Sequence, residues 1–182
     1  MSVLAQIVSE INGVLEQIDE AGILKLAYSL TMAKRIFVVG EGRSGLMAKA
    51  FAMRLMHLGA AVYVVGETIT PALAKEDLLI GVSGSGKTEM VVRFTQKAME
   101  IGAATYAITT NSSSPLAGAA MHVLVVPAAT KHRNQGEKET IQPLGSQFDQ
   151  AVHITLDAVC LLYANLRQED SQIVLGRHSN LE

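Results

Sequence analysis

The stretch Asp77-Leu-Leu-Ile-Gly-Val-Ser-Gly-Ser-Gly-Lys-Thr-Glu89 joins an apolar run to a loop of small residues, and an amphipathic segment follows it. This order predicts a strand, a loop and the start of a helix. Glycines let an anion approach the backbone, and the first N–H groups of a helix have no partner within the helix. The hydroxyls of Ser83, Ser85 and Thr88 add further donors. The stretch therefore predicts a phosphate site.

A second loop of the same kind, Gly40-Glu-Gly-Arg-Ser-Gly45, also lies between an apolar run and a helical pattern. Around the two loops, short apolar runs alternate with helical segments. Apolar strands of five or six residues indicate a parallel sheet covered on both faces. We expect strands at 35–39, 61–65, 77–82, 103–109 and 121–126, and helices at 23–33, 44–58, 88–101, near residue 116 and at 146–166. The fold class is α/β, a three-layer αβα sandwich with a five-stranded parallel sheet.

An additional helix is predicted at the N-terminus, because apolar residues recur there at spacings of three and four. They are Leu4, Ile7, Ile11, Val14 and Ile18. This stripe could cover the core of the domain or form a subunit contact. We expect one domain over residues 1–182, with the helix at about 2–20 and the tail at about 168–182 in subunit contacts.

The composition narrows the class of protein. The chain has 182 residues, 49% of them hydrophobic, a net charge of −2 and no Trp. A weakly acidic chain with few aromatic residues argues against nucleic-acid binding, and we expect a cytoplasmic protein that does not bind membranes. The single cysteine, Cys160, lies in an apolar helical stretch and is expected to be structural. His122 and His153 have no partners at ligand spacing, so no metal site is expected.

Each loop also matches a nucleotide-binding motif. Gly40-x-Gly-x-x-Gly45 fits the dinucleotide fingerprint, with Glu67 at about the distance of its acidic residue. Gly81-x4-Gly86-Lys87-Thr88 fits the phosphate loop of nucleotide triphosphatases, but no later strand ends in the Asp that would hold Mg²⁺. A third interpretation uses both loops. If the first and third strands are neighbours, the loops meet at the carboxyl edge of the sheet and bind one phosphate monoester.

The two loops resemble those of the sugar isomerase (SIS) family of phosphosugar-binding domains. Further matching segments extend the resemblance over nearly the whole chain: Gly42–Lys49, Arg54–Gly59, Val65–Thr68 with Thr70-Pro71, Gln142–Ser146 and His178–Glu182. The chain departs from the family pattern at two positions. Lys87 stands where the family has Glu or Arg, and Asp149 stands where it has Glu.

The resemblance implies an isomerase that interconverts D-arabino-3-hexulose 6-phosphate and fructose 6-phosphate, as in the ribulose monophosphate pathway of formaldehyde fixation or detoxification. The ketone would move between C3 and C2 through a cis-enediolate, with a base that carries the proton between the two carbons. No cofactor is expected. We expect a homo-oligomer with a small phosphosugar as its substrate, and a tetramer is the expected form.

Four residues are candidates for the catalytic groups: Asp149, Glu67, His57 and His178. Asp149 is the first choice for the base, although a carboxylate in the first turn of a helix is also favoured by the helix dipole. His57 could equally interact with the dipole at a helix C-terminus, and His178 could complete the site of a neighbouring subunit. The expected phosphate-binding residues are Arg43, Ser44, Ser83, Gly84, Ser85, Gly86, Lys87 and Thr88.

Three other functions stay open at this stage. The chain could be another phosphosugar isomerase of the SIS family, of the aldose–ketose type. It could be a non-catalytic sensor of sugar phosphates, although it has no basic helix-turn-helix region. It could also bind a nucleotide through Gly40–Gly45.

Overall fold

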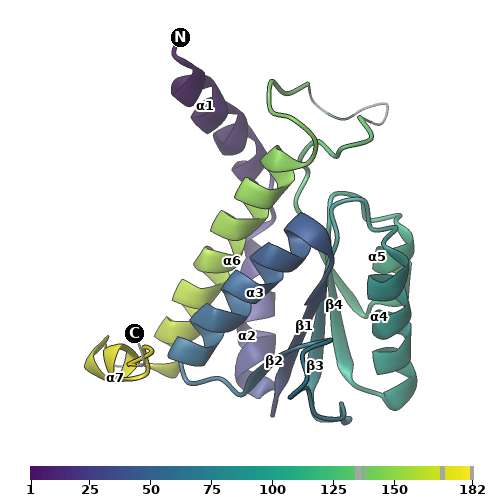
Figure 1. Ribbon diagram of the computed structural model, residues 1–182, viewed down its shortest axis with the longest axis vertical. Coiled ribbons are helices and arrows are strands. Elements are labelled where there is room, and N and C mark those ends of the chain that lie inside the picture. The colour runs from purple at the N-terminus through teal and green to yellow at the C-terminus, as the bar shows by residue number, and fades with distance from the viewer. Residues whose placement is uncertain (134–136, 138, 169–170, 181–182) are drawn as a thin grey trace.

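A parallel β-sheet forms the centre of the fold in the computed structural model, which describes residues 1–133, 137, 139–168 and 171–180 (Figure 1). Its strands lie in the order β2-β1-β3-β4-β5, and all neighbouring pairs are parallel. The strands are β1 (Ile36–Gly40), β2 (Val62–Val64), β3 (Leu78–Val82), β4 (Ala104–Thr109) and β5 (His122–Val125). This is a doubly wound sheet, in which the order of the strands reverses between β1 and β3.

Successive side chains of β1 pack on opposite faces of the sheet, as the pleat of a strand requires. Ile36 and Val38 belong to one buried apolar cluster, together with Phe51 from the first large crossover helix. Phe37 and Val39 belong to a second cluster on the other face, together with Val91. Both faces of the strand are therefore buried, which explains why its sequence is apolar without interruption.

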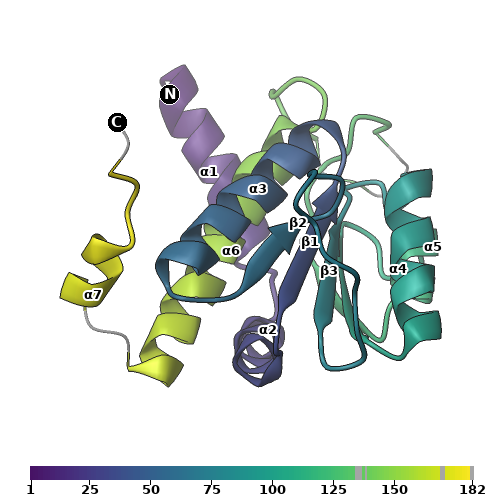
Figure 2. The ribbon, with the colours of Figure 1, turned by 60° about the horizontal axis from the view of Figure 1, so that its bottom comes forward.

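Helices cover both faces and give three layers (Figure 2). One face carries α4 and α5, and the other carries α1, α2, α3 and α6. The helices are α1 (Val3–Leu15), α2 (Glu20–Met32), α3 (Gly42–His57), α4 (Glu89–Ile101), α5 (Pro115–Ala119), α6 (Ser146–Arg167) and α7 (Ser171–Gly176). Among the described residues, none of these helices has the length and apolar character needed to cross a bilayer.

The predicted fold class is confirmed, and the strands and large helices begin and end within a few residues of their expected limits. The expected neighbourhood of the first and third strands is confirmed by the β1–β3 pairing. The helix α7 was not predicted, because its segment is short and has no clear apolar stripe. Part of the expected tail, at 169–170 and 181–182, lies outside the described residues, as do residues 134–136 and 138.

The N-terminal helix divides into two parts. Val14 is buried at its C-terminal end, and Ile18 is buried just beyond it, so this end covers the core. At the other end Leu4 is 75% exposed and Val8 is 64% exposed. Figure 1 shows this part of α1 projecting past the rest of the fold. The first half of the stripe therefore presents an apolar surface that the described part of the chain leaves exposed.

Cys160 lies on the buried side of α6. Burial, with a contribution from the nearby Asp157, raises the pKa of its thiol to about 12. The thiol is therefore protonated at neutral pH and a poor nucleophile. This environment agrees with the structural role expected for it.

Candidate functional site

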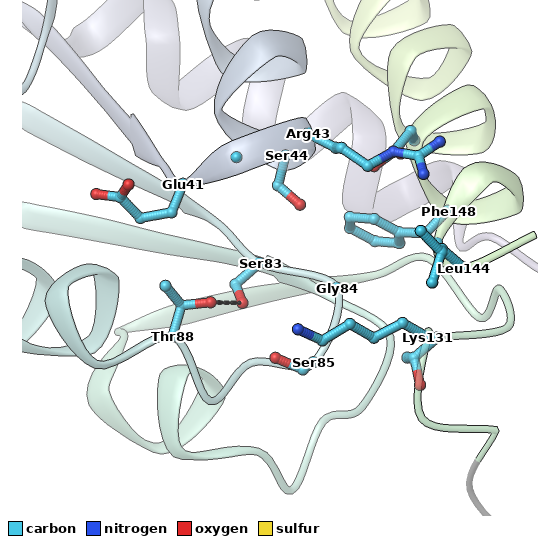
Figure 3. Close-up of a pocket in the computed structure, with 14 residues that line it drawn as sticks. Glu41, Arg43, Ser44, Ser83, Gly84, Ser85, Thr88, Lys131, Leu144 and Phe148 are labelled. Carbon is cyan, nitrogen blue, oxygen red and sulfur yellow. Dashed lines mark hydrogen bonds and ion pairs between the residues drawn. The ribbon is translucent and has the colours of Figure 1, made fainter.

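The two small-residue loops meet at one pocket. The pairing of β1 with β3 sets Gly40 opposite Val82, so the loops that follow the two strands lie side by side at the carboxyl edge of the sheet. The pocket has a volume of about 410 Å³ (Figure 3). It is lined by Glu41, Gly42, Arg43, Ser44, Ser83, Gly84, Ser85, Thr88, Thr130, Lys131, Leu144, Gly145, Phe148 and Asp149.

The loop after β3 is held in one shape by its own hydroxyls. The Oγ of Ser83 lies 2.8 Å from Oγ1 of Thr88, and it also accepts a hydrogen bond of 3.1 Å from the N–H of Gly86. The carbonyl of Gly84 accepts a hydrogen bond of 2.8 Å from the Thr110 hydroxyl. These bonds fix the loop before any ligand binds, so that little ordering is required when a ligand arrives.

Three helices point their N-termini at the pocket: α3, α4 and α6. The residues at their N-caps, Glu41, Thr88 and Gly145, make no side-chain capping hydrogen bond. By contrast α1, α2 and α5 begin elsewhere and are capped by the side chains of Ser2, Asp19 and Ser114. Uncapped N–H groups and three positive dipole ends together favour an anion at this position.

Gly45 lets α3 start close to the end of β1. A Cβ at this position would lie 2.6 Å from the carbonyl oxygen of Gly40, which is nearer than two such atoms can approach. Gly40 and Gly45 of the motif therefore serve the close packing of helix on strand. This role does not require a dinucleotide.

Gly86 gives the sharpest test of the loop's shape. Its φ is 61°, and a Cβ there would lie 2.2 Å from the Oγ of Ser114. We expect Gly86→Ala to displace the loop and to destabilise the fold by about 1–3 kcal/mol, because an L-residue is strained at positive φ and overpacked. Urea unfolding and calorimetric titration with inorganic phosphate measure the two effects. Gly118→Ala is the control, because a Cβ on Gly118 meets nothing within 4 Å. Unchanged stability and phosphate binding in Gly86→Ala would contradict this account.

A buried carboxylate and an arginine form the other side of the pocket. Asp149 lies in the first turn of α6 and is 9% exposed. The Nε of Arg43 lies 2.7 Å from its Oδ2, and the same guanidinium donates a hydrogen bond of 2.7 Å to the Oγ of Ser146. The pair therefore connects the starts of α3 and α6, directly beside the loop Ser83–Thr88 after β3, which we term the serine loop.

The surroundings of Asp149 move its pKa in the direction that suits a base. Burial raises the pKa of the carboxyl above its ordinary value, and the charge and hydrogen bond of Arg43 offset part of the rise. A base with a pKa nearer to neutrality accepts a carbon-bound proton more readily than an ordinary carboxylate. The carboxylate is thus available for proton transfer in the pocket.

Two of the expected phosphate-binding residues do not line the pocket. Lys87 is exposed, and Gly86 is buried within the loop. Glu67 lies outside as well. It lines a separate hollow of about 280 Å³ at the edge strand β2, with Met53, Met56 and other side chains.

The two expected catalytic histidines lie together, but far from Asp149 in this chain. Their rings stack with 5.1 Å between centroids, and Arg177 donates a hydrogen bond of 3.2 Å to the carbonyl of His57. His57 ends α3, whereas Arg43 lies in its first turn. Because α3 has 16 residues, its ends are about 24 Å apart at ~1.5 Å per residue. Among the described residues, no group of three His, Cys, Asp or Glu side chains could hold a metal ion.

Several pocket residues were not singled out from the sequence: Glu41, Thr130, Lys131, Leu144, Gly145 and Phe148. Glu41 and Gly145 stand within motifs that were recognised, so their position could have been expected. Lys131 belongs to the polar segment 127–140 after β5, which is long enough to be a functional loop. Periodicity gave no sign that this loop folds back to the serine loop.

Comparison with known proteins agrees with this site. The SIS domain family matches residues 29–154. The 3-hexulose-6-phosphate isomerase of Bacillus subtilis (strain 168) is 38% identical over 179 residues, which are 98% of this chain and 97% of the relative. That of Mycobacterium gastri is also 38% identical, over 98% of this chain and 89% of its own. A Methanococcus jannaschii protein superposes on this chain with a TM-score of 0.85, at 33% identity over 98% of both chains. Its crystal structure led to the inference that it is a 3-hexulose-6-phosphate isomerase. The chain therefore belongs to the SIS domain family.

Proposed function

We propose that this chain is a 6-phospho-3-hexuloisomerase, which interconverts D-arabino-3-hexulose 6-phosphate and fructose 6-phosphate. The observation that carries the proposal is the buried Asp149 paired with Arg43, directly beside an anion cradle formed by three uncapped helices. Two relatives that match nearly the whole chain bear the name 3-hexulose-6-phosphate isomerase. The reaction would serve the ribulose monophosphate pathway of formaldehyde fixation or detoxification.

The reaction needs a base and a stabilised oxyanion. Asp149 removes the proton from C2 of the 3-ketose, which leaves a cis-enediolate across C2 and C3. The same carboxyl then returns the proton to C3 while the proton of the C2 hydroxyl passes to the oxygen on C3, so that C3 becomes the alcohol and the ketone is now at C2. The negative charge develops on oxygen beside the Arg43 guanidinium, which stabilises it electrostatically. Ser44, Ser83, Ser85 and Thr88 hold the phosphate.

Activity with a panel of phosphosugars tests this proposal. We expect the protein to convert freshly prepared 3-hexulose 6-phosphate to fructose 6-phosphate in the presence of EDTA. Arabinose 5-phosphate and sedoheptulose 7-phosphate should not be turned over at a comparable rate. Turnover of arabinose 5-phosphate instead would identify an aldose–ketose isomerase. Binding of sugar phosphates without turnover of any of them would identify a sensor.

We further propose that the active protein is a homo-oligomer, in which the stacked His57 and His178 of one copy complete the site of another. The distance between these histidines and Asp149 within one chain supports this arrangement, as do the exposed side chains of α1. Mixing Asp149→Asn protein with His178→Ala protein should restore turnover, because some mixed sites then contain both native residues. Failure to restore turnover after subunit exchange, or full activity of His178→Ala alone, would reject a shared site.

A further inference from the structure

Lys131 is the lysine whose side chain lies at the pocket. It follows Thr130 in the loop after β5, and both residues line the cavity. Figure 3 shows the side chain of Lys131 extending toward Ser85. Ser44 and Arg43 lie on the opposite side of the pocket. A lysine distant in sequence thus reaches the loop after β3, while Lys87 within that loop is exposed and does not line the cavity.

The ammonium of Lys131 is available to an anion. The other cation of the pocket, Arg43, is already paired with Asp149. Within residues 1–133, 137, 139–168 and 171–180, no carboxylate forms an ion pair with Lys131. A phosphate dianion in the cradle would therefore meet one cation that has no acidic partner, in addition to the three helix N-termini.

We propose that Lys131 binds the phosphate group of the substrate, and that Glu10 of α1 is a positioning residue that holds the Lys131 loop against the pocket. The identity of the sugar phosphate rests on the proposed function. The phosphate contact itself follows from the geometry of the pocket.

Glu10 anchors the far end of the loop through several bonds. Its carboxylate accepts hydrogen bonds from the Thr140 hydroxyl at 2.5 Å, the Ile141 N–H at 2.9 Å and the Gln142 side chain at 3.2 Å. Burial alone would raise the pKa of Glu10, but these hydrogen bonds and the charge of Arg133 lower it below the ordinary value. The anchor is therefore ionised at neutral pH, when its bonds are strongest.

The anchor is connected to Lys131 by further bonds within the loop. The guanidinium of Arg133 donates to the carbonyl of Gln142 at 2.5 Å and to the carbonyl of Thr130 at 3.1 Å. The N–H of Ala129 donates a hydrogen bond of 2.8 Å to the buried side chain of Gln147 in α6. Both ends of the Lys131 segment are thus fixed, one to α1 and one to the helix that carries Asp149.

Titration calorimetry with fructose 6-phosphate and with inorganic phosphate tests the contact without requiring turnover. We expect Lys131→Met to weaken the binding of both ligands by about 10- to 100-fold, because a charge-assisted hydrogen bond to a dianion is lost. Lys131→Arg should recover most of the affinity, and Lys97→Met on the outer side of α4 should bind as the wild type does. In turnover, KM should rise while kcat changes little, because the phosphate is bound equally in ground and transition states.

A double-mutant cycle tests the role of Glu10. Glu10→Gln should weaken phosphate binding in the wild-type background and have little further effect in Lys131→Met, since it acts through that lysine. Glu16→Gln is the matched control, because Glu16 is exposed at the end of the same helix and contacts Asn12. Additive effects of Glu10→Gln and Lys131→Met would show that Glu10 does not act through Lys131.

Two results would overturn the Lys131 proposal. One is unchanged phosphate affinity in Lys131→Met, with the loss appearing in Lys87→Met instead. The other is a fall in kcat at constant KM, which would place Lys131 at the reacting carbons. A wild type that binds fructose 6-phosphate through Lys131 but does not turn over 3-hexulose 6-phosphate would reject the proposed function and leave the Lys131 contact supported.

Discussion

Asp149→Asn is expected to lower the turnover of 3-hexulose 6-phosphate by about 10²- to 10⁴-fold, the usual contribution of a positioned general base. Asn has the same shape but cannot accept the C2 proton. Substrate binding should persist, because the phosphate is held by the serine loop and the helix N-termini. Steady-state kinetics and calorimetric binding of fructose 6-phosphate separate the two effects.

Asp157→Asn provides the matched control for this prediction. Asp157 stands on the same helix and pairs with Arg54 at 2.5 Å, but it does not line the pocket. Its substitution should leave kcat within about two- to threefold of the wild type, since it lies outside the reacting geometry. The activity of the native enzyme should also rise with pH through the raised pKa of Asp149, because the base must be ionised. An Asp149→Asn enzyme with nearly full activity would move the base to Glu41, Glu67 or a histidine.

Asp77→Asn is expected to reduce stability and not activity, with a loss of about 3 kcal/mol in the free energy of unfolding. Asp77 is 2% exposed and forms a two-point ion pair with Arg35, at 3.0 Å to Nε and 2.6 Å to Nη2. Removing one partner of a buried pair leaves the other uncompensated, which costs about 3–5 kcal/mol when both are fully buried. Because Arg35 is partly exposed, we expect the lower end of this range. Chemical denaturation measures it.

The pKa of Asp77 determines the pH dependence of this effect. Burial alone would raise the pKa, but hydrogen bonds from Arg35 and the N–H of Ala74, together with the Arg35 charge, lower it below its ordinary value. The ion pair therefore contributes stability at pH values above the unfolded pKa, and the contribution is lost as pH falls through the lowered folded pKa. The difference between wild type and Asp77→Asn should be full at pH 7 and shrink in strong acid. A difference that does not change with pH would contradict the ion-pair explanation.

The two aspartates distinguish structure from function in this fold. Asp77 precedes β3 and pairs with Arg35, which precedes β1, so the pair ties the amino ends of two strands, far from the pocket. The pKa of Asp77 is lowered, whereas that of Asp149 is raised. A carboxylate with a raised pKa opposes folding at neutral pH. Asp149→Asn should therefore cost little stability, and Asp77→Asn should cost little activity in the folded fraction.

Much of the fold could be predicted from local pattern. The apolar runs of β1 and β3 indicated strands buried on both faces, and the loops that follow them predicted where an anion site would form. Neighbouring strands then brought Arg43, Ser44 and the serine loop together, as expected. These features depend on residues close in sequence, or on one rule about the carboxyl ends of parallel strands.

The remaining features depend on contacts that sequence spacing does not encode. Lys131 reaches the pocket because Glu10, far away in the chain, holds its loop. Lys87 was expected at the phosphate because it stands in the loop, but it is exposed and does not line the pocket. His57 lies on α3, which begins at the pocket, but it stands at the other end of that helix. The structure separates His57 from Asp149 by about the length of α3 within one chain.

Proton exchange at carbon is the measurement that tests the central claim most directly. The protein is incubated with fructose 6-phosphate in D₂O containing EDTA, and the sugar protons are followed by NMR. Deuterium is predicted at C3, together with the appearance of 3-hexulose 6-phosphate, and both should be lost in Asp149→Asn. Exchange confined to C1 would contradict the account, because it would place the enediolate between C1 and C2 and identify an aldose–ketose isomerase.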